Sequence, residues 1–347
     1  MAVYDCFPFN NELDLLDFRL TTYWETVDIF VISESSWAFD GNRKPLYATE
    51  YVKRKYGETK KIVIVEYEPS HEILSELHRN RWPIENLARQ TLAEGFKNAS
   101  EEDLIILSDC DEFLSFEQID KALKTTAILS GITPMFFRKG NFLVSHSARW
   151  QRVRMGPKRL MVNLNEIRDA NYPSVIALEG MHLSYLETND MDVLSKHSTS
   201  AHSEIDVDRQ FLVEALRIGA QFGIDHLGRF ETRNFGLIKI LKKKNLNDFQ
   251  RLFLVHSPKY FDFNAPKQNL LRRVSASRRL SLAWESLNML ELAKIDLLSK
   301  REVLLDCCFA LIFLIKKFAD RIIAKLNLLF KEGLSIMKVP ISRIMRN

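Results

Sequence analysis

Two aspartates, Asp109 and Asp111, stand one residue apart in the segment LIILSDCDEF at 104–113. The uninterrupted aliphatic run before them is typical of a buried strand, so both carboxylates should lie at the end of that strand. Carboxylates at i and i+2 can turn toward one cation, and Mg²⁺ or Mn²⁺ commonly bridges such acids to a nucleotide diphosphate. The alternative is a solvated turn or a helix N-cap, for which Ser108 and Glu112 are suitable.

The elements that would position this pair alternate between strands and helices. Apolar and β-branched runs predict four strands, at 2–7, 27–35, 60–67 and 101–113. Apolar residues at helical spacing predict helices at 11–24 and 82–99, and a loop followed by a short helix at 39–57. Such alternation predicts an α/β fold: a doubly wound, mostly parallel sheet with helices on both faces. Ligands of such sheets bind at the carboxyl ends of the strands.

Composition narrows the class of protein without naming a function. The chain has 347 residues, is 46% hydrophobic, and carries 49 basic against 45 acidic residues, a net charge of +4. This mild excess is compatible with a membrane surface or a phosphate ligand, and it does not indicate nucleic acid as a partner. The N-terminus lacks a signal peptide pattern, and the four cysteines lack zinc or disulfide spacing, which favours the cytoplasm. The cysteines are Cys6, Cys110, Cys307 and Cys308.

Several segments along residues 2–235 together resemble glycosyltransferase family 17. In order, they are VYDCFPFNNELDLLDFRL, FVISESSWAFDGNRKPLY, WPIENLARQ, LIILSDCDEF, GMHLSYLE and KHSTSAHSE. The best-known members add the bisecting N-acetylglucosamine to the β-mannose of N-glycans. The resemblance implies a GT-A fold, a sugar-nucleotide donor and inversion at the anomeric carbon. Met181 stands where the family usually has tryptophan and Glu187 where it usually has glycine, which affects the expected acceptor preference most.

The resemblance also implies a metal site. Asp109 and Asp111 would hold Mn²⁺ or Mg²⁺, which would bind the diphosphate of a donor, UDP-N-acetylglucosamine being the one that the family favours. GT-A enzymes often complete the metal shell with a histidine from later in the chain, and a neutral imidazole suits Mn²⁺. His202 and His182 are the two candidates, with His182 also a candidate for contact with the donor. A core or surface histidine is the alternative for each.

An inverting transfer requires a base that takes the proton of the acceptor hydroxyl. Glu204 and Glu187 are the candidates for this base, and Glu179 is a third carboxylate in the same region. Glu34, just past a predicted strand, could accept hydrogen bonds from the uridine base or ribose, or it could be a solvated loop acid. Arg89, one helix before the aspartates, is the candidate that binds the diphosphate.

Basic residues gather in RWQRVRMGPKRL at 149–160. Arg149, Arg152 and Arg154 could form a row of guanidinium groups that binds a phosphate of the donor or of a lipid-linked acceptor. The alternative is a solvated face of a strand.

The C-terminal segment differs in character from residues 1–265, which form the predicted catalytic domain. Residues 266–347 are basic and predicted helical, and 302–330 show apolar positions at helical spacing with lysine and arginine between them. This pattern is typical of an interfacial helix and predicts peripheral contact with the inner face of a membrane. A helix packed on the catalytic domain or on a second subunit fits equally well.

Three functions remain open at this point. The first is a metal-dependent inverting glycosyltransferase that moves N-acetylglucosamine from a nucleotide-diphosphate donor to a glycan or lipid-linked glycan. The second is another nucleotide-sugar enzyme such as a nucleotidyltransferase, although these usually have a glycine-rich phosphate loop and no glycine precedes Gly41 here. The third is a non-catalytic binding module, which the intact Asp109 and Asp111 argue against.

Overall fold

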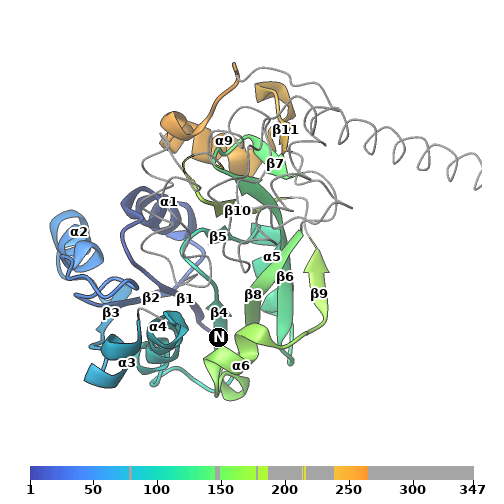
Figure 1. Ribbon diagram of the computed structural model, residues 1–347. Helices are drawn as coiled ribbons and strands as arrows, with labels where there is room; N and C mark the ends of the chain where they lie inside the picture. The colour runs from blue at the N-terminus through green and yellow to red at the C-terminus, as the bar shows by residue number, and fades with distance from the viewer. Residues whose placement is uncertain are drawn as a thin grey trace, which may run out of the picture. The chain divides into compact units, whose positions relative to one another are not determined.

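Strands and helices alternate through the first half of the chain as the apolar periodicity predicts (Figure 1). The computed structural model describes residues 1–77, 80–144, 149–176, 179–186, 213, 215 and 238–264. Its strands are β1 (Val3–Pro8), β2 (Ile29–Glu34), β3 (Ile62–Glu66), β4 (Leu104–Leu107), β5 (Glu112–Phe113), β6 (Leu129–Phe137), β7 (Phe142–Val144), β8 (Arg149–Pro157), β9 (Ser174–Ile176), β10 (Met181–Ser184) and β11 (Ile238–Ile240). Its α-helices are α1 (Leu13–Tyr23), α2 (Tyr47–Tyr56), α3 (His71–Glu76), α4 (Trp82–Gly95), α5 (Phe116–Ala122), α6 (Leu164–Asp169) and α9 (Asp248–His256). Short 3₁₀ turns follow at Lys158–Leu160, Lys243–Asn245 and Pro258–Tyr260.

The strands form one curled, mixed sheet in the order β11-β7-β6-β8-β4-β1-β2-β3. The part β4-β1-β2-β3 is parallel, whereas β8 runs antiparallel to β4 and to β6, and β7 and β11 continue the antiparallel part. Beside the main path, β9 and β10 run parallel to β6, and β5 pairs antiparallel with β10. The prediction of a mostly parallel sheet is therefore wrong for its second half, because apolar runs do not encode strand direction.

Strand register brings four carboxyl ends to one edge. Cys6 of β1 lies opposite Leu107 of β4, and Pro8 lies opposite Ser33 of β2. Glu34 of β2 in turn lies opposite Glu66 of β3. The segment after β4 therefore begins at the edge where open α/β sheets bind their ligands.

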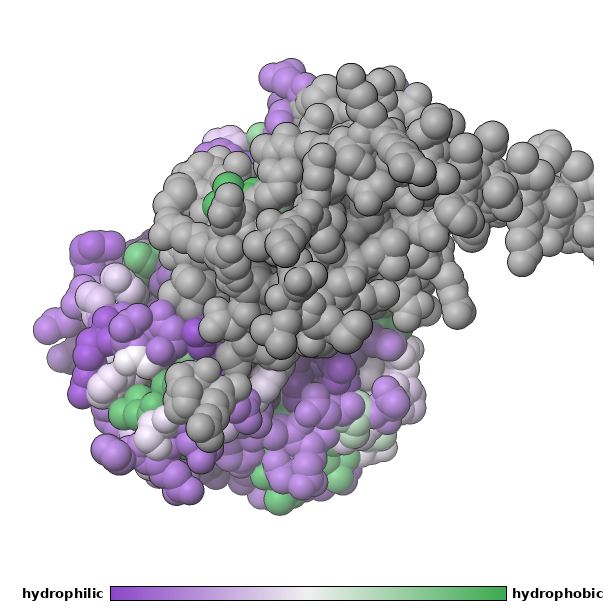
Figure 2. Space-filling model, in the orientation of Figure 1, coloured by the Kyte–Doolittle hydropathy of each residue, from purple (hydrophilic) through white to green (hydrophobic). Residues whose placement is uncertain are grey.

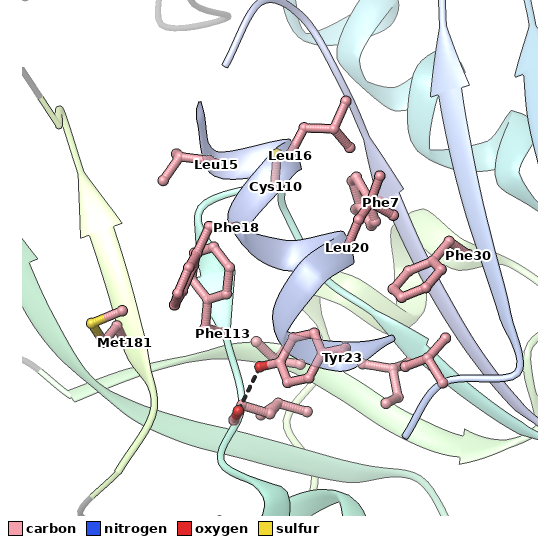
Figure 3. Close-up of a cluster of buried hydrophobic side chains, with 14 of the residues drawn as sticks. Phe7, Leu15, Leu16, Phe18, Leu20, Tyr23, Phe30, Cys110, Phe113 and Met181 are labelled. Carbon is pink, nitrogen blue, oxygen red and sulfur yellow. Dashed lines mark hydrogen bonds between the residues drawn. The ribbon is translucent and has the colours of Figure 1, made fainter. Parts of the chain in front are cut away.

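Helices cover both faces of the parallel part, as predicted (Figure 1). Because side chains alternate across a strand, β1 sends Val3 and Phe7 to the core under α1 and α2, and Tyr4 and Cys6 to the core under α4 and α6. Figure 3 shows the first of these cores, in which the Tyr23 hydroxyl of α1 also donates to the carbonyl of Leu114 at 2.5 Å. The first helix is thus fixed to the segment that follows β5.

The described elements belong to one unit of the chain, formed by residues 1–217 and 236–266. The predicted extension at 266–347 lies outside the described residues, so the prediction of membrane contact stays a prediction. No helix in the described ranges combines the length and apolar character that a bilayer crossing requires. In the view of Figure 2, the coloured surface is mostly hydrophilic, with hydrophobic residues in small groups.

Candidate functional site

The two aspartates lie where the chain leaves the carboxyl end of β4. That strand is buried at all four positions, between β1 and β8. Cys110, between the aspartates, is 5% exposed and belongs to the core that contains Phe113 (Figure 3). The side chains of Asp109 and Asp111 keep 34% and 15% of their surface exposed. The segment therefore buries its cysteine while both carboxylates keep contact with solvent.

A buried arginine binds the backbone of this segment. Arg19 of α1 donates to the carbonyl oxygens of Asp109 and Glu112, at 3.0 and 2.9 Å, and to the hydroxyl of Ser108 at 2.5 Å. The guanidinium also forms a two-pronged ion pair with Asp5 of β1, and this partner raises the pKa of Arg19 although its burial acts the other way. Arg19 thus fixes the backbone that carries both aspartates.

Two further arginines converge on Asp109. Nη2 of Arg168 lies 2.6 Å from its Oδ2, and Nη2 of Arg89 lies 3.6 Å from its Oδ1. Burial alone would raise the pKa of Asp109, but Arg168 and then Arg89 outweigh it and hold this pKa below its usual value. Within the described ranges, neither Oδ1 of Asp109 nor the buried Nε of Arg89 has a hydrogen-bond partner. The unsatisfied oxygen thus faces the guanidinium that carries the unsatisfied N–H, as expected where a ligand supplies the partners.

Glu112, the third acid of the motif, is completely buried and holds the motif together. Its two oxygens accept hydrogen bonds from Arg168 at 2.8 and 2.6 Å, the bidentate geometry of a strong ion pair. The carboxylate also accepts the backbone N–H of Asp109 at 2.8 Å and the indole N–H of Trp150. Glu112 therefore supports the site from its buried side.

Asp111 has its contacts on the other side of the motif. Its Oδ1 lies 3.8 Å from Nε2 of His182, and its carbonyl accepts the N–H of Leu183 at 2.9 Å. His182 is buried on β10, and its ring stacks on Trp150 with the centroids 4.2 Å apart. The structure thus brings His182 close to Asp111, and a role of His182 with a metal or a donor stays a prediction.

The carboxylates at this site are the side chains that would hold the predicted Mn²⁺ or Mg²⁺. Within the described ranges, no group of three or more His, Cys, Asp or Glu side chains is arranged to hold a metal ion. Carboxylate oxygens are nevertheless the donors these ions prefer, and Mg²⁺ often takes one or two carboxylates together with phosphate oxygens and water. The unsatisfied Oδ1 of Asp109, with Asp111 two residues on, fits an ion of this kind.

Glu34, predicted to contact the donor, has a structural partner at each oxygen. The side chain is completely buried and accepts the backbone N–H groups of Ala48 and Thr49, at 2.8 and 2.9 Å, at the start of α2. Lys44 lies 3.6 Å away, and burial lowers the pKa of Lys44 although Glu34 opposes the shift. The alternative of a solvated loop acid is wrong, and contact of Glu34 with a donor stays a prediction.

Two of the three arginines predicted to form a row, Arg152 and Arg154, point in different directions, and the side chain of Arg149 lies outside the described part. Arg154 is buried and donates to the carbonyls of Ile167, Arg168 and Ala170 at the end of α6, at 3.0, 2.8 and 2.8 Å. Arg152 instead points outward and pairs with Asp169 at 3.1 Å. Arg154 therefore anchors the helix that carries Arg168, and neither a phosphate-binding row nor a wholly solvated face describes this strand.

The remaining predicted site residues fall mostly outside the described ranges. Glu187, His202 and Glu204 do so, and their roles stay predictions. Glu179 is described and exposed.

Arg19 is one residue of the candidate site that the sequence analysis missed, although a signal was present. Leu15, Leu16, Leu20 and Tyr23 mark the apolar side of the helix, and Arg19 falls among them at i+4 from Leu15 and i−4 from Tyr23. A charged residue on a buried helical face requires a buried partner, which here is Asp5.

Fold and site together define an α/β protein with an acidic candidate site at the carboxyl ends of its parallel strands. The sequence profile of glycosyltransferase family 17 matches residues 1–218, so the chain belongs to this family, a family of sugar-transfer enzymes. The structure is also similar to that of HddC from Yersinia pseudotuberculosis, at 10% identity and a TM-score of 0.27, over 53% of this chain and 89% of that one. The same protein complexed with GMP-PN matches at 11% identity, a TM-score of 0.27 and the same coverage. No curated protein sequence matches the chain.

Proposed function

We propose that the protein is a metal-dependent inverting glycosyltransferase of GT-A type. It moves a sugar, N-acetylglucosamine before others, from a nucleotide-diphosphate donor to a glycan or lipid-linked glycan. The observation that carries the proposal is the pair of unsatisfied groups in a family 17 chain: Oδ1 of Asp109, and Nε of the Arg89 guanidinium that faces this carboxylate. A cation on the oxygen and a phosphate on the N–H would satisfy both.

Asp109 and Asp111 hold the cation in this proposal. The ion, Mn²⁺ or Mg²⁺, would stabilise the negative charge that develops on the leaving nucleoside diphosphate. Formal charge agrees with one divalent ion, because four carboxylates converge here with two guanidinium groups, an excess of two negative charges. The carboxylates are Glu85, Asp109, Asp111 and Glu112, and the guanidinium groups are those of Arg89 and Arg168.

Arg89 binds the diphosphate in this proposal. Its guanidinium is buried, and Glu85 and Asn165 orient it at 2.7 and 3.3 Å. A preorganised guanidinium offers directed N–H donors to phosphate oxygens. Glu204 or Glu187 would act as the base toward the acceptor.

The test is a thermal-shift panel of nucleoside-diphosphate sugars on the full chain, with and without Mn²⁺. A ligand at about 100 times its Kd stabilises the folded state by about 2.7 kcal/mol, which raises the melting temperature. Asp109→Asn should abolish the shift. Asp169→Asn is the matched control, because Asp169 is 81% exposed and pairs with Arg152 at the surface of the described part of the chain.

A second readout separates the classes of enzyme. A glycosyltransferase that slowly hydrolyses its donor releases a nucleoside diphosphate, whereas a nucleotidyltransferase working on a sugar phosphate and a nucleoside triphosphate releases pyrophosphate. Failure of every donor to bind, or equal binding by Asp109→Asn, would overturn the proposal. Release of pyrophosphate would favour the nucleotidyltransferase instead.

A further inference from the structure

Four side chains connect Asp109 to Asp111 through an unbroken series of contacts. They come from separate segments of the chain and form a bridge that begins at Oδ2 of Asp109 and ends at Oδ1 of Asp111. In order along the bridge they are Arg168 of α6, Glu112 of β5, Trp150 of β8 and His182 of β10. Together with the motif backbone, this bridge closes a ring around the two aspartates.

In the first half of the bridge, every terminal N–H group of Arg168 has an acceptor. The two terminal nitrogens of Arg168 carry four N–H groups, and the structure gives them four acceptors. These are both oxygens of Glu112 at 2.8 and 2.6 Å, Oδ2 of Asp109 at 2.6 Å and the carbonyl of Arg152 at 2.5 Å. Arg168 therefore has little left to offer a ligand through these nitrogens. It fixes one oxygen of Asp109, while the other accepts no hydrogen bond within the described ranges.

The second half depends on Trp150. Its indole N–H donates to Glu112, and its ring lies against that of His182 at an angle of 26° between the planes. His182 then meets Asp111 at 3.8 Å. Trp150 thus contacts both Glu112, which accepts the backbone N–H of Asp109, and His182, which faces Asp111.

We propose that Arg168, Glu112 and Trp150 are positioning residues that fix the two aspartates relative to each other, so that they share one divalent cation. The inference rests on the proposed function. Two carboxylates repel each other, and a rigid surrounding network keeps them in a shared geometry before the ion binds. Residues that orient metal ligands in this way typically change metal affinity about 10–100-fold when they are altered.

The test measures Mn²⁺ affinity directly, in the full chain without sugar nucleotide, from the free Mn²⁺ signal in electron paramagnetic resonance. Glu112→Gln keeps the size of the side chain and removes its charge, and it should weaken Mn²⁺ binding about 10–100-fold. Trp150→Phe keeps a ring against His182 and removes only the N–H, and it should weaken binding about tenfold. Trp150→Phe keeps the proposal testable if Glu112→Gln fails to fold.

Two controls match these changes. Trp24→Phe alters a tryptophan at the end of α1 that stacks on Tyr56 of α2, with centroids 4.9 Å apart. Glu117→Gln alters an exposed glutamate of α5 that pairs with Lys121. Both should bind Mn²⁺ as the wild type does, and circular dichroism should show that every variant is folded.

The outcomes separate this inference from the proposed function. If Asp109→Asn loses Mn²⁺ while folded Glu112→Gln and Trp150→Phe bind it like the wild type, the positioning role is overturned and the metal site stands. If the wild type does not bind Mn²⁺, or if Asp109→Asn binds it equally well, the proposed metal site fails, and this inference fails with it. Weaker binding in all three variants, with both controls unchanged, supports both.

Discussion

The guanidinium of Arg19 and the carboxylate of Asp5 form a two-pronged ion pair inside the core, with N···O distances of 2.6 and 2.7 Å. Each side chain is only 2% exposed. The remaining donors of Arg19 reach the backbone around Asp109, so the pair links β1 and α1 to the segment that carries the candidate metal ligands. One contact between the first strand and the first helix therefore supports both the fold and the site.

Removing this arginine should strongly destabilise the protein. Arg19→Met leaves the charge of Asp5 buried without a partner, and breaking a buried ion pair in this way costs about 3–5 kcal/mol. The free energy of unfolding, measured by urea denaturation, should fall by that amount. Asp5→Leu combined with Arg19→Met should recover part of the loss, because no unpaired charge then remains.

Arg251→Met is the control for this change. Arg251 pairs with Asp248 on the surface of α9, where it is 56% exposed, and its loss should alter stability by about 0.5 kcal/mol or less. If Arg19→Met behaved like this control, the buried pair would not have the structural role assigned to it.

Gly180, just before β10, should not tolerate a side chain. Its φ is +89°, and a Cβ built there would lie 2.6 Å from the carbonyl oxygen of Phe113. Gly180→Ala should therefore lower the melting temperature more than Gly57→Ala, whose φ is +64° but whose Cβ would meet nothing within 4 Å. Gly57→Ala isolates the backbone strain, about 1–3 kcal/mol, and the difference between the two variants reports the steric clash. Equal losses would mean that the chain near Phe113 adjusts freely.

Sequence reasoning placed the aspartates correctly because local patterns determine their position. An apolar run of strand length fixes where the strand ends, and alternation along the segment turns Cys110 inward. The same reasoning could not provide the partners of the motif. Arg168 and Glu112 are 56 residues apart, and residue spacing alone does not determine such a contact.

The wrong predictions, of an arginine row and of a mostly parallel sheet, also concern features that local spacing does not determine. Arg154 is one of several arginines in a basic segment, and only the tertiary fold shows that it is buried against the end of α6. Likewise, the apolar pattern of β6 and β8 is compatible with either strand direction, and their antiparallel pairing depends on the path of the chain between them. Local periodicity predicts elements, whereas direction and long-range ion pairs are properties of the assembled sheet.

Acid should remove the stability that the ionised Asp17 of α1 contributes to the fold. Asp17 accepts hydrogen bonds from Lys55 and Tyr51 and lies 3.2 Å from Nε2 of His256. Burial would raise the pKa of Asp17, but Lys55 and Tyr51 outweigh it and lower this pKa from its ordinary value of 3.8. A folded-state pKa below the unfolded one adds stability above about pH 4, and this stability is lost as the pH falls through the folded value. Thermal midpoints between pH 3 and 7 should therefore fall less steeply at the acid end for Asp17→Asn than for the wild type, and parallel curves would contradict this.

Arg89 offers the most direct test of how the donor binds. Arg89→Lys keeps the positive charge beside Asp109 but removes Nε–H, which the structure leaves buried and unbonded. A hydrogen bond to a charged group contributes about 1.5–3 kcal/mol, so the affinity for UDP in the presence of Mn²⁺ should fall by at least about tenfold. The affinity for Mn²⁺ alone should change little, because the charge near Asp109 is retained. Arg159→Lys, at a partly exposed pair with Glu102, is the matched control for isothermal titration calorimetry. Equal UDP affinities in both variants would mean that the diphosphate lies elsewhere, whereas a loss confined to Arg89→Lys would place it against this guanidinium.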